Sequence, residues 1–269
     1  MSHVGNNQAQ PHQTEPDQTE PEQAQPAQAH SHQAEVSGQP ASRPQTIGVL
    51  GAGRVGTAVA RQALKAGYEV KIATSRPAAE NALLVEIITP GAAAVDVSEA
   101  VQADLVVVAV PLHRYRTLSP EALAGKTVID AMNYWAPIDG TITDFEDGVR
   151  GSSEVVQEFL AESNIVKTLN HIGYHDLEAD GAGPGTPGRR ALAVAGDDPE
   201  ARTRVAEFLD RLGYDAVDAG PLAAGRVFQP GTAIFNGPHT AAAVRDLLGE
   251  VLDNAPDNTP DNAPAAAAA

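Results

Sequence analysis

Residues 46–76 read TIGVLGAGRVGTAVARQALKAGYEVKIATSR, and this stretch decides the fold. A short apolar run leads into a turn in which Gly51, Gly53 and Gly56 have the spacing G-x-G-x-x-G. Small and apolar residues then recur at helical spacing, and residues 69–73 form a second apolar run. Strand, glycine-rich turn, helix and strand in this order are the context in which such a turn binds the pyrophosphate of a dinucleotide. We therefore predict a dinucleotide-binding unit rather than an ordinary glycine turn.

The end of the second apolar run, Thr74, Ser75 and Arg76, determines which nicotinamide cofactor fits. Folds that select NAD place an Asp or Glu here, which binds the ribose hydroxyls and repels a 2′-phosphate. This chain instead offers two hydroxyl groups and a guanidinium, and a guanidinium binds phosphate through paired, charge-assisted hydrogen bonds. The sequence therefore favours NADP(H). Arg54, inside the glycine turn, either contacts the cofactor phosphates or is solvated.

Apolar runs and helical segments alternate along the chain between residues 45 and 252. Such alternation is typical of a parallel sheet with helices on both faces. The run LVVVAV, residues 105–110, is the clearest strand and should be central. We expect an α/β fold with a doubly wound, Rossmann-like parallel sheet and a small C-terminal extension. Its strands are expected near residues 45–50, 69–73, 92–95, 105–110, 126–131, 164–169, 191–195 and 214–217.

The two ends of the chain differ in composition from the part between them. Residues 1–44 are rich in Gln, Pro, Glu and Ala, and residues 253–269 repeat an Asp-Asn-(Ala/Thr)-Pro unit before a run of alanines. Neither end has enough apolar surface to offset the entropy lost on ordering, so both are expected to be disordered tails. We assign residues 45–178 to a dinucleotide-binding domain and residues 179–252 to a small C-terminal α/β part that completes the cleft.

The composition argues against several classes of function. The chain has 269 residues and a formal net charge of −17, which opposes binding to nucleic acid or to an anionic membrane. It has no cysteine, so thiolate catalysis and cysteine metal sites are excluded, and we expect no metal site of another kind. It shows neither a signal peptide nor an apolar run long enough to cross a bilayer. We expect a cytoplasmic protein whose partners are small-molecule cofactors.

Further candidate residues follow two strands, at the edge where ligands lie in a doubly wound sheet. Val110 and Pro111 end the clearest strand, and His113 either contacts the ribose or nicotinamide side of the cofactor or caps a helix. Asn133, close to the single tryptophan Trp135, either lines a substrate cleft or belongs to aromatic packing under a loop. The residues alone leave both alternatives open.

Five segments, in this order, resemble a known family: GAGRVG (51–56), TSR (74–76), VVVAVP (106–111), KTLNHIG (167–173) and DAGPLAAGR (218–226). Over about residues 45–235 the chain is similar to the NADPH-dependent reductases of coenzyme F420, the NADP:deazaflavin oxidoreductases. The resemblance implies a nucleotide-binding domain and a small C-terminal domain, with both cofactors in the cleft between them. It also implies hydride transfer between nicotinamide C4 and deazaflavin C5, which depends on stacking and exclusion of water more than on a catalytic acid or base.

The resemblance assigns roles to individual residues but identifies no catalytic acid, base or nucleophile. On the cofactor side it implies a pyrophosphate site, a 2′-phosphate site and a border along the cofactor, formed respectively by Gly51, Gly53, Arg54, Val55 and Gly56, by Ser75 and Arg76, and by Val110 and Pro111. On the substrate side it implies contacts with the nicotinamide and deazaflavin rings by Asn170, His171, Ile172 and Gly173, with Leu222 closing the far side. The chain departs from the family pattern at Glu80, where members often have a basic residue, and at Asn170, where archaeal-type members have a histidine.

Three functions remain in competition. The first is an enzyme that transfers a hydride between NADPH and coenzyme F420. The second is an NADP-dependent reductase of a small imine or carbonyl substrate, for which Tyr134, Tyr174 and His171 are the available proton donors, although none has a recognisable spacing. The third is a protein that senses NADPH or binds a partner without catalysis. Folds of this kind commonly form dimers, and although no motif requires it, a homodimer is a further expectation.

Overall fold

The strand–turn–helix–strand stretch forms as predicted, as β1 (Thr46–Leu50), α1 (Arg54–Lys65) and β2 (Glu69–Ala73). The structure is a computed structural model that describes residues 45–146, 148–235 and 237–253. The apolar residues of β1 are buried, and its neighbours β2 and β4 cover both of its edges with parallel pairing. β1 therefore lies inside the sheet, as an uninterrupted apolar run predicts.

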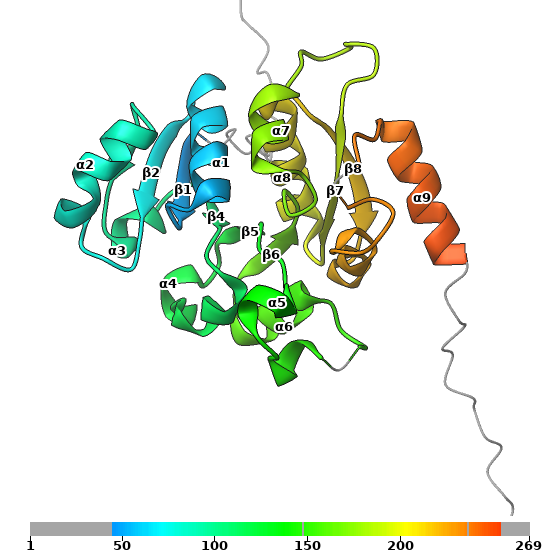
Figure 1. The fold of residues 1–269 in the computed structure, drawn as a ribbon, viewed down its shortest axis with the longest axis horizontal. Coiled ribbons are helices and arrows are strands. Elements are labelled where there is room, and N and C mark those ends of the chain that lie inside the picture. Colours follow the sequence, from blue (N-terminus) through cyan, green and yellow to red (C-terminus); the bar gives the residue numbers. More distant parts are fainter. Residues whose placement is uncertain (1–44, 147, 236, 254–269) are drawn as a thin grey trace, which may run out of the picture. The chain divides into compact units, whose positions relative to one another are not determined.

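One sheet contains all eight strands in the described part of the chain, in the order β3-β2-β1-β4-β5-β6-β7-β8 (Figure 1). The order reverses at β1 and β4, so a crevice opens at the carboxyl ends of these two strands, where doubly wound folds bind ligands. The remaining strands are β3 (Ala93–Ala94), β4 (Leu105–Val108), β5 (Thr127–Asp130), β6 (Asn164–Lys167), β7 (Ala191–Gly196) and β8 (Asp215–Gly220).

The sheet is not parallel throughout, which differs from our expectation. β6 and β7 pair antiparallel, with Val166 opposite Gly196 and Lys167 opposite Ala195, whereas β7 and β8 pair parallel. The connection from β6 contains only the six-residue helix α7 (Tyr174–Ala179) before the loop that enters β7. A helix this short does not carry the chain back to the opposite edge of the sheet. β7 therefore starts near the end of β6 and runs in the reverse direction.

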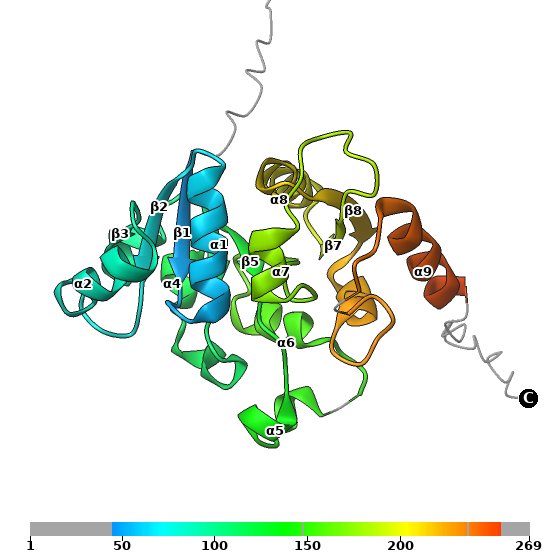
Figure 2. The same cartoon turned by 45° about the horizontal axis from the view of Figure 1, so that its top comes forward.

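Helices cover the sheet and bury three groups of apolar side chains. The largest group joins α1, α7 and α8 (Pro199–Leu212) to the sheet, and Figures 1 and 2 show these helices beside one another. A second group joins α3, α4, α6 and η1 to the central strands, and a third joins α9 and η3 to β7 and β8. The bounds of these and the other helices are α2 (Ala78–Ile88), α3 (Val97–Ala100), η1 (Leu112–Thr117), α4 (Pro120–Leu123), α5 (Ala136–Asp139), η2 (Thr143–Phe145), α6 (Ser152–Phe159), η3 (Leu222–Phe228) and α9 (Ala241–Asp253).

The predicted tails lie outside the described residues, apart from Asp253, which is the last residue of α9 instead of the first of a tail. The division between a dinucleotide-binding domain and a C-terminal part at residues 178 and 179 stays a prediction. β7 and β8, which belong to the predicted C-terminal part, extend the same sheet as β1–β6. Among the described residues no helix is both long enough and apolar enough to pass through a membrane.

Candidate cofactor and substrate site

Two of the three glycines of the first turn have a structural reason to lack a side chain, and the third lies in open space. Gly51 has a φ of 117°, which L residues rarely adopt. A Cβ on Gly56 would lie 1.9 Å from the carbonyl oxygen of Gly51, so helix α1 approaches the turn too closely for any side chain. A Cβ on Gly53 would have nothing within 4 Å. The turn is therefore tight on two sides and open at Gly53, where a phosphate can approach the start of α1.

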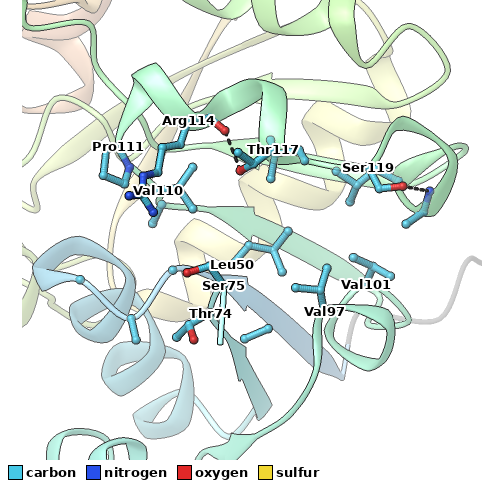
Figure 3. Close-up of a pocket in the computed structure, with 18 residues that line it drawn as sticks. Leu50, Thr74, Ser75, Val97, Val101, Val110, Pro111, Arg114, Thr117 and Ser119 are labelled. Atoms are coloured by element: carbon cyan, nitrogen blue, oxygen red, sulfur yellow. Dashed lines mark hydrogen bonds between the residues drawn. The ribbon is translucent and has the colours of Figure 1, made fainter. Parts of the chain in front are cut away.

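A cavity of about 460 Å³ lies at the carboxyl ends of β1, β2 and β4, next to this turn (Figure 3). Its walls are mainly apolar, and among the described residues its only charged lining side chain is Arg114. The turn, the end of β2 and helix η1 surround it. The lining consists of Leu50, Gly51, Ala52, Gly53, Ala73, Thr74, Ser75, Val97, Val101, Ala109, Val110, Pro111, Arg114, Thr117, Leu118, Ser119, Ala122 and Leu123.

The three residues predicted to select the cofactor lie differently with respect to this cavity. Thr74 and Ser75 line it. The hydroxyl of Thr74 accepts a hydrogen bond of 3.1 Å from the backbone N–H of Arg76, which leaves Ser75 as the hydroxyl without such a local bond. Arg76 is exposed and is not among the lining residues. Its side chain has no ion-pair partner within residues 45–146, 148–235 and 237–253 and can turn toward a ligand bound at Ser75.

Two other predicted cofactor residues already have partners at the surface. The Arg54 Nη1 group donates a hydrogen bond of 3.3 Å to the hydroxyl of Tyr174, and its guanidinium lies 5.6 Å from the centre of that ring. His113 contacts Asp139 through Nδ1 at 2.9 Å. The side chain of His113 is 41% exposed and that of Asp139 is 5% exposed, so a half-exposed ring contacts a buried carboxylate. Neither residue is among those that line the cavity.

The segment Asn170–Gly173 forms a turn that is buried and hydrogen-bonded within the protein. The side-chain amide of Asn170 donates to Asn133 Oδ1 at 3.0 Å and to the carbonyl oxygen of Phe228 at 2.9 Å. Asn133 Nδ2 in turn donates to the backbone carbonyl of Asn170 at 2.6 Å. Leu169, which precedes the turn, has a φ of 63°, an unusual value for a bulky residue. Asn133 and Asn170, both predicted on the substrate side, are thus brought together.

His171 is a neutral, satisfied core histidine. The backbone N–H of Ala193 donates to its Nε2 at 3.0 Å, so the ring proton lies on Nδ1, which donates to Asn170 Oδ1 at 3.0 Å. The residue is 2% exposed, and burial, reinforced by the nearby positive charge of Lys167, lowers the pKa of His171 to about 3. Both ring nitrogens are therefore engaged within the fold, and in this arrangement the ring does not supply a proton.

Ile172 and Leu222, predicted to lie on two sides of the substrate rings, pack into different groups of the core. Ile172 belongs to the group under α1 and α8, and Leu222 belongs to the group under α3, α4 and α6. Both are nearly fully buried, at 6% and 2% exposure. Gly173 precedes helix α7 as its N-cap residue. The structure does not bring Ile172 and Leu222 into one group, and their roles at a substrate stay predictions.

A buried ion pair lies behind this turn, and sequence reasoning missed it. Lys167 is fully buried, and its Nζ lies 3.5 Å from Asp130 Oδ2 and also donates to the carbonyl oxygen of Met132. Asp130 accepts a further hydrogen bond of 2.6 Å from the hydroxyl of Ser153 and one of 2.9 Å from the backbone of Met132. Burial lowers the pKa of Lys167, and the charge of Asp130 opposes this shift. The pair connects the ends of β5 and β6, from which Asn133 and Asn170 extend.

Arg114 and the apolar lining from α3 and η1 were also missed. An arginine three residues after Pro111 reads as a solvated side chain, because nothing local shows that the turn faces a cavity. The one available signal is position, since Arg114 follows the carboxyl end of a central strand. Among the described residues no group of three or more His, Asp or Glu side chains is arranged to hold a metal ion.

Comparison with known proteins supports the resemblance found in the sequence. Residues 46–134 match the family described as NADP oxidoreductase coenzyme F420-dependent. The chain resembles this family over that segment, which is about a third of its length. Members of the F420-dependent oxidoreductase family are NADP-dependent oxidoreductases by that description, and the segment matched includes every residue that lines the cavity.

Two solved structures resemble the chain over most of its length. A hypothetical protein of Sinorhizobium meliloti has 29% sequence identity and a TM-score of 0.62, over 74% of this chain and 93% of the other. A protein of Arthrobacter sp. FB24, described as a candidate F420-dependent NADP reductase, has 27% identity and a TM-score of 0.58, over 68% of this chain and 87% of the other. These similarities confirm the predicted Rossmann-like α/β fold.

Another relative is the metalloreductase STEAP3 of Rattus norvegicus, which is 28% identical over 191 residues. The match covers 70% of this chain but only 36% of that protein. The chain thus spans little more than a third of the length of this curated relative.

The predicted site residues of this chain fall into two sets. One set lines a single cavity and consists of Gly51, Gly53, Thr74, Ser75, Val110 and Pro111. The other set lies outside that lining and consists of Arg54, Val55, Gly56, Arg76, His113, Asn133, Asn170, His171, Ile172, Gly173 and Leu222. The functional role of each residue in both sets stays a prediction.

Proposed function

We propose that this protein transfers a hydride between NADP(H) and coenzyme F420, a deazaflavin. The observation that carries the proposal is the agreement between the family match and the cavity. The whole lining, from Leu50 to Leu123, lies inside the segment that matches the coenzyme F420-dependent family. Similarity to the candidate F420-dependent reductase of Arthrobacter supports the same activity.

The residues of the turn and of the end of β2 fit an NADP cofactor. The open space at Gly53 admits a pyrophosphate to the N-terminus of α1, where free N–H groups and the helix dipole favour negative charge. No carboxylate lines the cavity among the described residues, so a 2′-phosphate near Ser75 meets no repulsion there. Val110 and Pro111 border the cavity on the side of β4. NADP(H) is therefore the dinucleotide that this site suits best.

The bound nicotinamide supplies the hydride, and the protein's own contribution is binding, orientation and exclusion of water. The glycine turn and Ser75 hold the phosphate groups at fixed positions on the sheet edge. The Asn133–Asn170 pair holds the ends of β5 and β6 in register beside them. We infer that these strand ends present the surface on which the two ring systems stack.

The candidate proton donors favour hydride transfer to a deazaflavin over hydride transfer to a carbonyl or imine. Tyr134 donates to Glu146, the hydroxyl of Tyr174 accepts from Arg54, and His171 is buried and neutral. Reduction of a carbonyl or imine requires a positioned acid, whereas transfer to a deazaflavin needs no such group in the protein. The hydrogen bond of Tyr134 to Glu146 and the buried, neutral state of His171 therefore support the deazaflavin as acceptor.

The test is to mix the purified full chain with oxidised coenzyme F420 and either NADPH or NADH, and to follow the loss of the deazaflavin's visible absorbance. We expect rapid loss with NADPH and much slower loss with NADH. Arg116→Ala serves as a matched control, because Arg116 pairs with Asp144 away from the cavity. Tight NADPH binding without reduction of F420 would contradict the proposal and leave the imine or carbonyl reductase and the NADPH sensor as alternatives.

A further inference from the structure

One charged side chain among the cavity's lining residues has no role so far. Arg114 lies on η1 and is the only charged residue that lines the cavity in the described part of the chain. Figure 3 shows its guanidinium extending from η1 into the space above Ser75 and the turn. A single positive charge in an otherwise apolar pocket, in a chain with a net charge of −17, points to an anionic ligand.

The backbone of Arg114 is fixed, whereas its side chain is available. Its backbone N–H donates to the carbonyl oxygen of Pro111 at 2.9 Å, and its carbonyl oxygen accepts from the hydroxyl of Thr117 at 2.8 Å. The basic residues beside it on η1 both have acidic partners, His113 with Asp139 and Arg116 with Asp144. Within residues 45–146, 148–235 and 237–253, the Arg114 guanidinium has no such partner.

A phosphate on the opposite wall of the cavity needs a positive charge nearby, and the residues of that wall place none inside the cavity. Ser75 offers a hydroxyl, but the hydroxyl of Thr74 is engaged with the backbone of Arg76, and the Arg76 side chain is not part of the lining. A phosphate bound at Ser75 therefore lies across the cavity from Arg114. The pyrophosphate, by contrast, already has the N-terminus of α1. The 2′-phosphate is thus the group that Arg114 is best placed to neutralise.

We propose that Arg114 is a specificity-determining residue that binds the 2′-phosphate of NADP(H) from the η1 wall, opposite Ser75. The inference rests on the proposed use of NADP(H) and adds a second guanidinium to the one at Arg76. A site that holds the phosphate with two arginines from different strand ends favours NADPH over NADH more strongly than a site with one arginine. NADH lacks the phosphate and therefore loses both charge-assisted contacts.

The test measures dissociation constants of NADPH and NADH for the full chain and for the variants Arg114→Ala and Arg114→Lys. We expect Arg114→Ala to weaken NADPH binding roughly tenfold to a hundredfold and NADH binding less than about threefold, since only NADPH has the phosphate. Arg114→Lys should recover part of the loss, because it keeps the charge without the paired hydrogen bonds. Arg116→Ala, on the same turn, should change neither constant.

Equal losses for the two nucleotides in Arg114→Ala would overturn the inference, because they would mean contact with the pyrophosphate or the adenine. Unchanged affinity for NADPH would overturn it as well. The outcome is separable from that of the proposed function, since binding is measured without F420. A chain that fails to reduce F420 but loses its preference for NADPH in Arg114→Ala would disprove the F420 activity and support the role of Arg114. Absence of NADPH binding by the unaltered chain would disprove both.

Discussion

The turn after β1 and the turn after β6 both follow a buried strand, but the first leaves space beside it and the second does not. The first leaves open space at Gly53, beside a cavity. The second is closed by its own polar groups, with Asn170 at 4% and His171 at 2% exposure. The first has open space beside it, whereas the second, in this arrangement, holds strands together. A short polar segment at a strand end is therefore not by itself a binding site, and its hydrogen-bond partners decide its role.

The largest expected effect comes from closing the first turn. Gly56→Ala forces a methyl group onto the carbonyl oxygen of Gly51 and should lower the free energy of unfolding by about 4 kcal/mol, measured by urea denaturation. Gly53→Ala is the matched variant, because its φ of −79° suits alanine and its Cβ meets open space. It should change stability by less than about 1 kcal/mol yet weaken NADPH binding at least roughly tenfold. Equal stability losses in the two variants would contradict this assignment.

The second turn should be sensitive to the ion pair behind it. Lys167→Met leaves the buried carboxylate of Asp130 without its cation and should lower the free energy of unfolding by about 3 kcal/mol. Replacing both residues, as Lys167→Met with Asp130→Leu, should be less destabilising than the single change, since no unpaired charge remains. Urea denaturation of both variants measures this difference. A double variant less stable than the single one would mean that the hydrogen bonds of Asp130 to Ser153 and Met132 dominate.

A substitution at the end of β2 should affect the binding of NADPH rather than the stability of the protein. Arg76 is exposed and unpaired among the described residues, so Arg76→Ala should leave the unfolding midpoint unchanged. It should weaken NADPH binding by roughly 1–3 kcal/mol, the size of a charge-assisted contact, with a smaller effect on NADH. Titration calorimetry with both nucleotides distinguishes these outcomes. Matching losses for NADPH and NADH would show that Arg76 does not bind the 2′-phosphate.

His171 should also make stability depend on pH. In the unfolded chain its pKa is near the ordinary 6.5, whereas burial lowers the folded value to about 3. The unfolded state therefore binds a proton first, and stability falls as the pH decreases from about 6.5 toward 3, by at most about 1.4 kcal/mol per pH unit from this residue. His171→Gln should show a shallower slope of unfolding free energy against pH over this range. An unchanged slope would mean that His171 is not buried and neutral.

The difference between the two turns also explains what the sequence predicts well. Gly51 and Gly56 meet local backbone constraints, and the spacing of these two glycines and Gly53 is visible without any knowledge of distant residues. The strands β1, β2 and β4 follow from uninterrupted apolar runs for the same reason. The reversal of β7 was not predicted, because it depends on the position in the fold at which the short helix α7 ends.

Long-range partners account for the rest. Lys167 reads as an ordinary strand residue in NIVKTL, and only the fold shows that its partner, Asp130, lies on the adjacent strand. His171 reads as a ring-facing residue until Ala193, on the reversed strand, is seen to occupy its Nε2. Arg114 reads as solvated until α3 and η1 are seen to enclose a cavity. Each of these depends on contacts between segments far apart in the sequence.

The measurement that tests the central claim most directly is the fate of a labelled hydride. NADPH carrying deuterium at one or the other C4 position is incubated with the protein and oxidised coenzyme F420, and the reduced deazaflavin is analysed by mass spectrometry. A dinucleotide held in one orientation on the turn and Ser75 presents one face of its ring, so we predict transfer of deuterium to C5 from one of the two labelled forms only. Reduced deazaflavin with hydrogen from solvent, or no reduction with either form, would contradict the account.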